Sequence, residues 1–150
     1  MTRRAVYHGP LGPLTLTEEN GQIASLDWHD RPGESSPLLD EAVRQLSAYF
    51  DRRLTAFDLP LAFGEGLNAD IRRAMVAIPY GHTRTYGEIA RELGVPAQVV
   101  GQGCGANSIP VIIPCHRVLG ATSLGGFSAK GGVETKVALL KLEGAASLLI

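Results

Sequence analysis

The chain has 150 residues, enough for one globular domain or two small ones with a buried core. Its composition, 45% hydrophobic and 19% charged, is ordinary for a globular protein, and no apolar run approaches the ~20 residues of a membrane helix. The net charge of −1 argues against a polybasic nucleic-acid binder, and two cysteines without an apolar leader lead us to expect a cytoplasmic protein with free thiols.

The N-terminal half is predicted to contain a β-hairpin and one helix. Apolar and polar residues alternate over residues 11–28 on both sides of Asn20-Gly21, a dipeptide typical of two-residue hairpin turns. After a loop at residues 30–37, apolar residues recur at helical spacing over residues 38–53. The glycine-terminated stretch 57–66 has the composition of a linker. These patterns predict a small α/β unit.

The second half is predicted to be mainly helical. Apolar residues at helical spacing mark a first helix over residues 71–78. Thr85 and Glu88 form a capping box at the start of a second helix that Gly94 ends. A third short helix, about residues 97–106, follows after a tight turn. This is the geometry of a DNA-binding helix-turn-helix, although any αα-hairpin gives the same pattern.

The third of these helices is rich in glycine, with Gly101, Gly103 and Gly105 in its interior. Each glycine costs about 1 kcal/mol relative to alanine at such a position. Small residues let either a neighbouring helix or an external ligand approach closely, and the segment leaves both explanations open. From residue 68 onward the chain carries eight Lys/Arg against five Asp/Glu, which suits contact with phosphate but is equally ordinary surface charge.

Cys115, in the stretch Ile-Pro-Cys-His-Arg-Val, is the strongest candidate for chemistry. A cysteine attacks as its thiolate, so it needs a base or a positive environment that lowers its pKa from about 8.5. We expect an extended strand here, on which His116 would reach the sulfur only through a bend or a bridging water. Glu143, near the end of the last predicted helix, is a candidate to orient His116. A buried, inert cysteine beside a core histidine is the alternative.

The longer pattern Asn-x-x-Pro-x-x-Ile-Pro-Cys-His-Arg-Val, residues 107–118, resembles the active-site signature of the O6-alkylguanine-DNA alkyltransferases, or methylated-DNA–protein-cysteine methyltransferases. Residues 78–97 are similar to the helix-turn-helix segment of this family, and residues 125–144 to its closing loop and last helix. Residues 45–61 resemble the end of its N-terminal domain. The resemblance implies an α/β fold: a small N-terminal α/β domain of the RNase H-like type (1–63), followed by a mainly helical C-terminal domain with a helix-turn-helix (64–150).

The resemblance also implies a function. An alkyl group is transferred directly and irreversibly from O6 of guanine, and also from O4 of thymine, to Cys115, so that each molecule acts once. The implied partner is double-stranded DNA with an alkylated guanine, bound through the minor groove with the damaged base flipped out of the stack. The family's pattern further implies a monomer that needs no cofactor, no metal and no membrane.

Site residues carry over from the family position by position. By this resemblance His116 deprotonates Cys115 through a water, Glu143 orients His116, and Asn107 shapes the turn before the active-site strand. The residues implied to contact the substrate are Tyr86, Val118, Ser128 and Arg117. Those implied to bind DNA are Gln98, Thr85, Ala97, Gly101 and Gly103.

Three positions depart from the family's usual pattern. Gln98 stands where an arginine usually replaces the extruded base, Arg72 stands at a tryptophan position, and Phe127 stands where tyrosine is commoner. Glutamine has no charge and a weaker stacking plane than arginine, so we expect poorer base flipping and weaker duplex affinity.

Five readings of the sequence compete, and four of them keep the alkyltransferase domain. Besides alkyl transfer, these are an alkyltransferase-like protein that recognises damage without repairing it, a family member whose substrate is altered because of Gln98, and a methylation-activated transcription factor. The reactive Cys115 argues against the recogniser, and the chain lacks room for the sensor domain of such a transcription factor. A generic cysteine hydrolase is the outsider, and it would turn over many equivalents of substrate.

Overall fold

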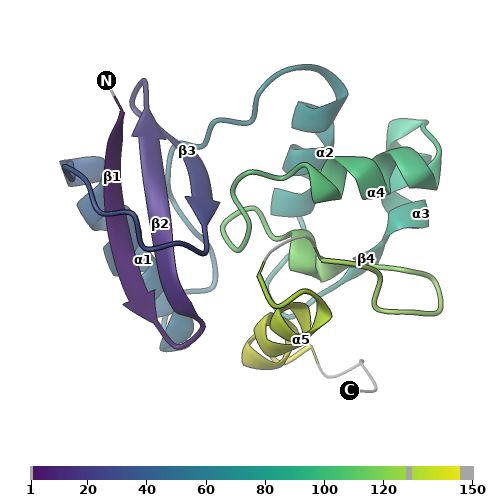
Figure 1. The fold of residues 1–150 in the computed structure, drawn as a ribbon. Helices are drawn as coiled ribbons and strands as arrows, with labels where there is room; N and C mark the ends of the chain where they lie inside the picture. Colours follow the sequence, from purple (N-terminus) through teal and green to yellow (C-terminus); the bar gives the residue numbers. More distant parts are fainter. Residues whose placement is uncertain (1, 128–129, 146–150) are drawn as a thin grey trace. The chain divides into compact units, whose positions relative to one another are not determined.

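The computed structural model describes residues 2–127 and 130–145. The chain divides into two compact units, Met1–Ala62 and Phe63–Ile150 (Figure 1). Among the described residues, no helix combines the length and the apolar character needed to cross a bilayer.

The first unit is built on a three-stranded antiparallel sheet in the order β1-β2-β3. The strands are β1 (Arg3–Gly9), β2 (Gly12–Glu19) and β3 (Gln22–Asp27). Asn20 and Gly21 have φ of 53° and 75°, the positive values that a two-residue type I′ turn requires, so the predicted hairpin is confirmed. Sequence reasoning missed β1, whose residues are only partly buried and therefore give no clean alternation.

Helix α1 (Pro37–Phe50) packs against β1 and β2. The Ser36 hydroxyl caps it by accepting a hydrogen bond from the Leu39 amide at 3.1 Å. Leu39, Leu46 and Tyr49 form its buried face. The predicted linker, residues 57–66, is in part attached to the first unit, because Leu61 makes a parallel β-bridge with Ile23 of β3.

The second unit opens with three helices that contact one another: α2 (Gly66–Val76), α3 (Tyr86–Leu93) and α4 (Ala97–Gly105). Both halves of the predicted capping box at Thr85 and Glu88 are present, at 3.1 and 2.8 Å. Gly94, at φ 69°, ends α3 in the left-handed conformation, and a short turn leads to α4. The helix-turn-helix geometry expected from the sequence is therefore confirmed.

Two short strands and a last helix complete the unit. Strand β4 (Arg84–Thr85) pairs in parallel with β5 (Val118–Leu119), which follows the 3₁₀ turn η1 (Cys115–Arg117). Helix α5 (Val133–Leu142) packs against η1. A small sheet domain followed by a mainly helical one is the fold class that the sequence predicted.

Candidate active site

Cys115 begins the 3₁₀ turn η1 rather than lying on a strand, so the predicted extended conformation is wrong at this point. Pro114 precedes the turn, and the Cys115 amide donates to the Ile113 carbonyl at 2.8 Å. Three residues per turn place successive side chains about 120° apart, not on opposite sides. The turn therefore supplies the bend that the sequence required, and the side chains of Cys115 and His116 do not point in opposite directions.

Asn107 fixes the loop that leads into η1. Its amide nitrogen donates to the Ile113 carbonyl at 2.9 Å, and its amide oxygen accepts from the Ile109 amide at 3.0 Å. Inside this loop Val111 has a φ of 73°, which is strained for a β-branched residue. Strain of this kind persists only where surrounding contacts hold it, and Asn107 supplies two of them.

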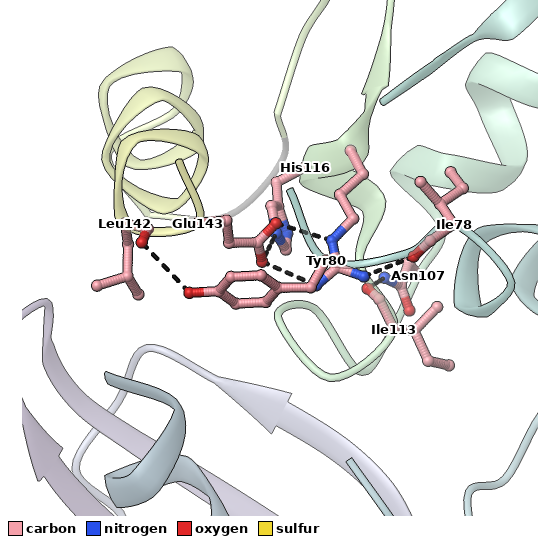
Figure 2. Close-up of polar contacts among 8 residues, drawn as sticks. Ile78, Tyr80, Asn107, Ile113, His116, Leu142 and Glu143 are labelled. Carbon is pink, nitrogen blue, oxygen red and sulfur yellow. Dashed lines mark hydrogen bonds and ion pairs between the residues drawn. The ribbon is translucent and has the colours of Figure 1, made fainter. Parts of the chain in front are cut away.

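His116 and Glu143 form the centre of a buried polar network (Figure 2). Both side chains are fully buried, and Nε2 of His116 lies 2.7 Å from Oε2 of Glu143. Arg117 donates to the same carboxylate twice, from Nε at 2.8 Å and from Nη2 at 2.9 Å. Its Nη1 donates to the Ile78 carbonyl at 2.7 Å. Glu143 thus joins the end of α5 to the turn that carries Cys115.

The network sets the tautomer and the charge of His116. Burial lowers the pKa of His116, as do the charges of Arg117 and Lys136, while Glu143 opposes the shift. A carboxylate that accepts two hydrogen bonds from Arg117 is acceptor-only, so Nε2 of His116 carries the hydrogen that faces it. Nδ1 of His116 has no hydrogen-bond partner among the described residues. It is therefore left as a basic nitrogen.

The electrostatics of Cys115 differ from the sequence-based expectation. Burial raises the pKa of the Cys115 thiol, although a hydrogen bond with Asn107 and the charge of Lys136 act in the opposite direction. We expected an environment that lowers this pKa. In the protein alone the thiol is therefore protonated, and attack requires a base to remove its proton.

Lys136 is a site residue that sequence reasoning missed. It is fully buried, and its Nζ donates to the carbonyls of Val118 and Gly126 at 2.6 and 3.1 Å. Nζ also lies 5.8 Å from the centre of the Tyr86 ring. Lys136 lies three residues before Leu139 and seven before Glu143, so it shares the inner face of α5 with them. This helical spacing is the sequence pattern that could have identified it.

A cavity of about 490 Å³ opens beside Cys115. The described residues that line it are Tyr86, Gly101, Cys104, Gly105, Cys115, Gly126 and Phe127. Its wall combines the helix-turn-helix, the turn η1 and the loop before α5. The lining includes two aromatic rings and otherwise only glycines and thiols, so it suits a flat, uncharged ligand.

Tyr86 lines this cavity, whereas Val118 is absent from its described lining. Burial raises the pKa of the half-buried Tyr86, and Cys104 and Cys115 add to the shift, so its phenol is protonated and can donate. Val118 is fully buried, and its carbonyl accepts from Lys136. Thr85 caps α3, which ties it to the helix-turn-helix.

Helix α4 presents an uncharged surface. Gln98 and Ala97 are exposed in its first turn, and Gly101 is half-buried. Gly103 is buried, and a Cβ added to it would lie 2.5 Å from Cδ1 of Ile71 on α2. The structure therefore assigns Gly103 to helix packing instead of the predicted DNA contact.

The remaining predicted residues are placed as follows. Arg117 is buried on Glu143 and is absent from the described cavity lining, so the geometry favours a supporting role over the predicted substrate contact. Ser128 lies outside the described residues. The part of the chain that is described contains no group of three or more His, Cys, Asp or Glu residues placed to hold a metal ion.

The chain is similar to known proteins over most of its length. Residues 67–145 match the family profile described as "6-O-methylguanine DNA methyltransferase, DNA binding domain", and residues 2–63 match its "ribonuclease-like domain". A Mycobacterium tuberculosis protein named methylated-DNA–protein-cysteine methyltransferase is 41% identical over 89% of this chain and 87% of its own length.

Two solved structures from Mycobacterium tuberculosis are also similar to the chain. The crystal structure of O6-methylguanine methyltransferase has a TM-score of 0.84 and 36% identity, and covers 100% of this chain and 97% of that one. The structure of OGT in complex with DNA has a TM-score of 0.82 and 39% identity, with 96% and 92% covered.

Proposed function

The chain belongs to the 6-O-methylguanine DNA methyltransferase family, and we propose that it repairs double-stranded DNA by moving an alkyl group from O6 of guanine to Cys115. The observation that carries the proposal is the arrangement around one thiol. Cys115 and Tyr86 both line the cavity. The next residue, His116, is buried, and its contact with Glu143, which Arg117 also holds, leaves Nδ1 of His116 as the basic nitrogen.

The chemistry is a displacement at carbon. His116 accepts the thiol proton through a bridging water, and Sγ attacks the alkyl carbon on O6. The S–C bond forms as the C–O6 bond breaks, the electron pair returns to the base, and N1 of guanine regains a proton. Glu143 stabilises His116 while it is protonated, and Asn107 holds the loop that aims Sγ.

The flipped base is recognised by residues of the cavity wall. The Tyr86 phenol donates a hydrogen bond to the acceptor edge of the base, and the Phe127 ring packs against its face. Backbone groups of Val118 and the side chain of Ser128 stay as proposed contacts. The exposed Gln98 and Ala97 and the half-buried Gly101 of α4 enter the minor groove, with Gln98 filling the space of the extruded base.

Several properties follow from this chemistry. A thioether is not readily hydrolysed, so each molecule reacts once, and neither a cofactor nor a metal takes part in the displacement. O4 of thymine presents a similar alkyl oxygen and is proposed as a second substrate. The protein acts as a monomer in the cytoplasm, with residues 1–63 as the N-terminal domain and residues 64–150 as the DNA-binding and alkyl-acceptor domain.

The test is a titration of the protein against a duplex with one O6-methylguanine, with the repaired base measured by nucleoside chromatography. Repair should stop at one guanine restored per protein molecule. Cys115→Ala should restore none, while binding of the duplex persists. Many equivalents restored would indicate a hydrolase. Binding without repair by the wild-type protein would favour the damage recogniser, and neither binding nor repair would point to an altered substrate.

A further inference from the structure

Helix α4 has few stabilising features of its own. Three of its nine residues are glycine, and each of these weakens a helix relative to alanine. Pro96 at its N-cap has no side-chain oxygen that could accept a hydrogen bond, and its last turn holds no basic residue. An isolated helix of this length is marginal in water. Contacts from other parts of the second unit must therefore hold α4 in place.

Helix α2 lies beside α4 (Figure 1), and its Arg72 reaches the C-terminal end of that helix. Nη2 of Arg72 donates to the carbonyl of Ala106, the C-cap residue of α4, at 3.0 Å. Nη1 donates to the Phe63 carbonyl at 3.2 Å. A cation is also favourable at this end of a helix, where carbonyl groups lack intrahelical partners. One guanidinium thus joins the end of α4 to the segment that precedes α2.

This contact lies where α4 and the active-site loop meet. On α2, Ile71 packs against Gly103, so two consecutive residues of one helix contact α4. Ala106 is followed by Asn107, whose side chain holds the loop to Cys115 through two hydrogen bonds of its own. Loss of Arg72 should therefore affect the end of α4 more than the loop.

We propose that Arg72 is a positioning residue for DNA binding, which orders the C-terminal end of α4 before the duplex arrives. The inference rests on the proposed function, in which α4 enters the minor groove. A helix end that is already ordered adds no ordering cost to binding. A loose end must be ordered by the duplex, and the cost of that ordering reduces affinity.

The residue type at this position supports the inference. The family's usual pattern has a tryptophan here, and an indole has one N–H donor. A guanidinium has five donors in a planar fork, so it can serve two carbonyls at once. The pair of hydrogen bonds from Arg72 to Ala106 and Phe63 is therefore not available to a tryptophan.

The experiment measures duplex affinity and single-turnover repair separately, on a duplex with one O6-methylguanine. Arg72→Leu should raise the Kd by about 5-fold, the equivalent of one hydrogen bond, and leave the rate at saturating duplex nearly unchanged. The slope of log Kd against log salt should stay the same, because Arg72 does not act through phosphate. Amide hydrogen exchange should become faster in the last turn of α4 and stay unchanged in α3.

The matched control is Arg73→Leu, which removes the same charge from the next position of α2. Arg73 is exposed, and its guanidinium lies 4.7 Å from the centre of the Phe63 ring. This variant should keep the affinity, the rate and the exchange pattern of the wild-type protein. Arg72→Gln keeps an amide donor without the charge. It replaces Arg72→Leu if that variant does not fold, and it should raise the Kd in the same way.

The outcomes separate the inference from the function beneath it. Wild-type affinity in both Arg72 variants, or an equal loss in Arg73→Leu, would overturn the inference alone. A salt slope reduced by about one would make Arg72 a phosphate contact and overturn it as well. A saturating rate that falls as much as the affinity would assign Arg72 to the active-site loop, with the same consequence. A wild-type protein that neither binds nor repairs this duplex would instead overturn the proposed function, and the inference with it.

Discussion

The carboxylate of Glu143 contacts both His116 and Arg117, and the charge of Arg117 affects the pKa of His116. Arg117 holds both carboxylate oxygens, at 2.8 and 2.9 Å, while His116 shares one of them. By balancing the charge of Glu143, Arg117 limits how strongly that carboxylate can draw a proton onto His116. We therefore propose that Arg117 is a positioning residue for His116, the proposed base.

Replacing Arg117 with leucine should change both the stability of the protein and its pH profile. The buried Glu143 would lose its main countercharge, which destabilises the fold by about 3–5 kcal/mol. The pKa of His116 should rise, because the charge of Arg117 lowers it in the wild-type protein. The acid limb of methyl transfer, followed over about pH 5–8, should then move to higher pH.

The control for this change is Arg44→Leu, which removes an exposed ion pair with Glu41. Like other exposed ion pairs, this one should contribute little to the free energy of unfolding, and the pH profile should be unchanged. An acid limb that keeps its position in Arg117→Leu would show that the arginine has only a structural role.

Replacing Lys136 with methionine should make Cys115 less reactive. The change removes a charge that lowers the pKa of the thiol and leaves two buried carbonyls without this donor, at a cost of about 1–3 kcal/mol. Alkylation of Cys115 by iodoacetamide, followed against pH, should shift to higher pH. Lys141→Met, at an exposed position of the same helix, should leave the curve in place. Superimposable curves for all three proteins would refute the electrostatic role.

At the scale of single elements, α4 is the proposed recognition helix, and it is unusual in that role because its sequence, Ala-Gln-Val-Val-Gly-Gln-Gly-Cys-Gly, carries no charge. Phosphate neutralisation supplies much of the affinity of DNA-binding proteins. Contacts from an uncharged helix depend instead on shape and on hydrogen bonds. The family's usual arginine at Gln98 would add a stacking plane and a charge at an exposed position.

Gln98→Arg should therefore bind duplex DNA more tightly and speed methyl transfer several-fold. Binding measured at several salt concentrations distinguishes the causes. A phosphate contact steepens the dependence of log K on log salt by about one, whereas stacking leaves the slope unchanged. The matched control is Gln102→Arg, an exposed position one turn later on α4. Equal gains in both variants would indicate a general charge effect and no special role for position 98.

The elements with strong local signals were predictable from the sequence. Thr85 with Glu88, and Asn20 with Gly21, form local contacts that their neighbours in the sequence dictate, and both motifs are present. The 3₁₀ turn at Cys115 was not predictable, because the proline and the loop held by Asn107 override an apolar run typical of a strand. Strand β1 escaped notice because its side chains are only partly buried.

The candidate site was predictable only in part for a related reason. The resemblance to a known family pointed to His116 and Glu143, which lie 27 positions apart and 2.7 Å from each other. No such pattern pointed to Lys136, since a lysine on an apolar helix face usually extends toward solvent. Its two carbonyl partners come from a strand and a loop, and only the tertiary structure brings them together.

At the scale of the whole molecule, two buried thiols make the folded state less stable as the pH becomes alkaline. Burial raises the pKa of Cys104 to about 12, and it raises the pKa of Cys115 as well. The folded state keeps these protons at pH values where an unfolded cysteine, with a pKa of about 8.5, has lost them. Their stabilising effect is therefore complete below about pH 8.5 and is lost as the pH rises toward the folded-state values.

The free energy of unfolding should consequently decline from about pH 8 to about pH 10, and less steeply in Cys104→Ala than in the wild-type protein. Urea denaturation at the two pH values gives the comparison. The variant also loses a 3.5 Å contact between Cys104 and Met75, so the change with pH is the informative quantity. Equal declines in the two proteins would mean that Cys104 does not contribute.

The central claim is that Cys115 itself receives the alkyl group, and intact-protein mass spectrometry after reaction with an O6-methylguanine duplex tests it most directly. The account predicts a gain of one methyl group per chain, mapped by proteolysis to the peptide that contains Cys115. Cys104, buried on α4 with a strongly raised pKa, should stay unmodified. A duplex that is bound or repaired while the mass of Cys115 stays unchanged would contradict the account.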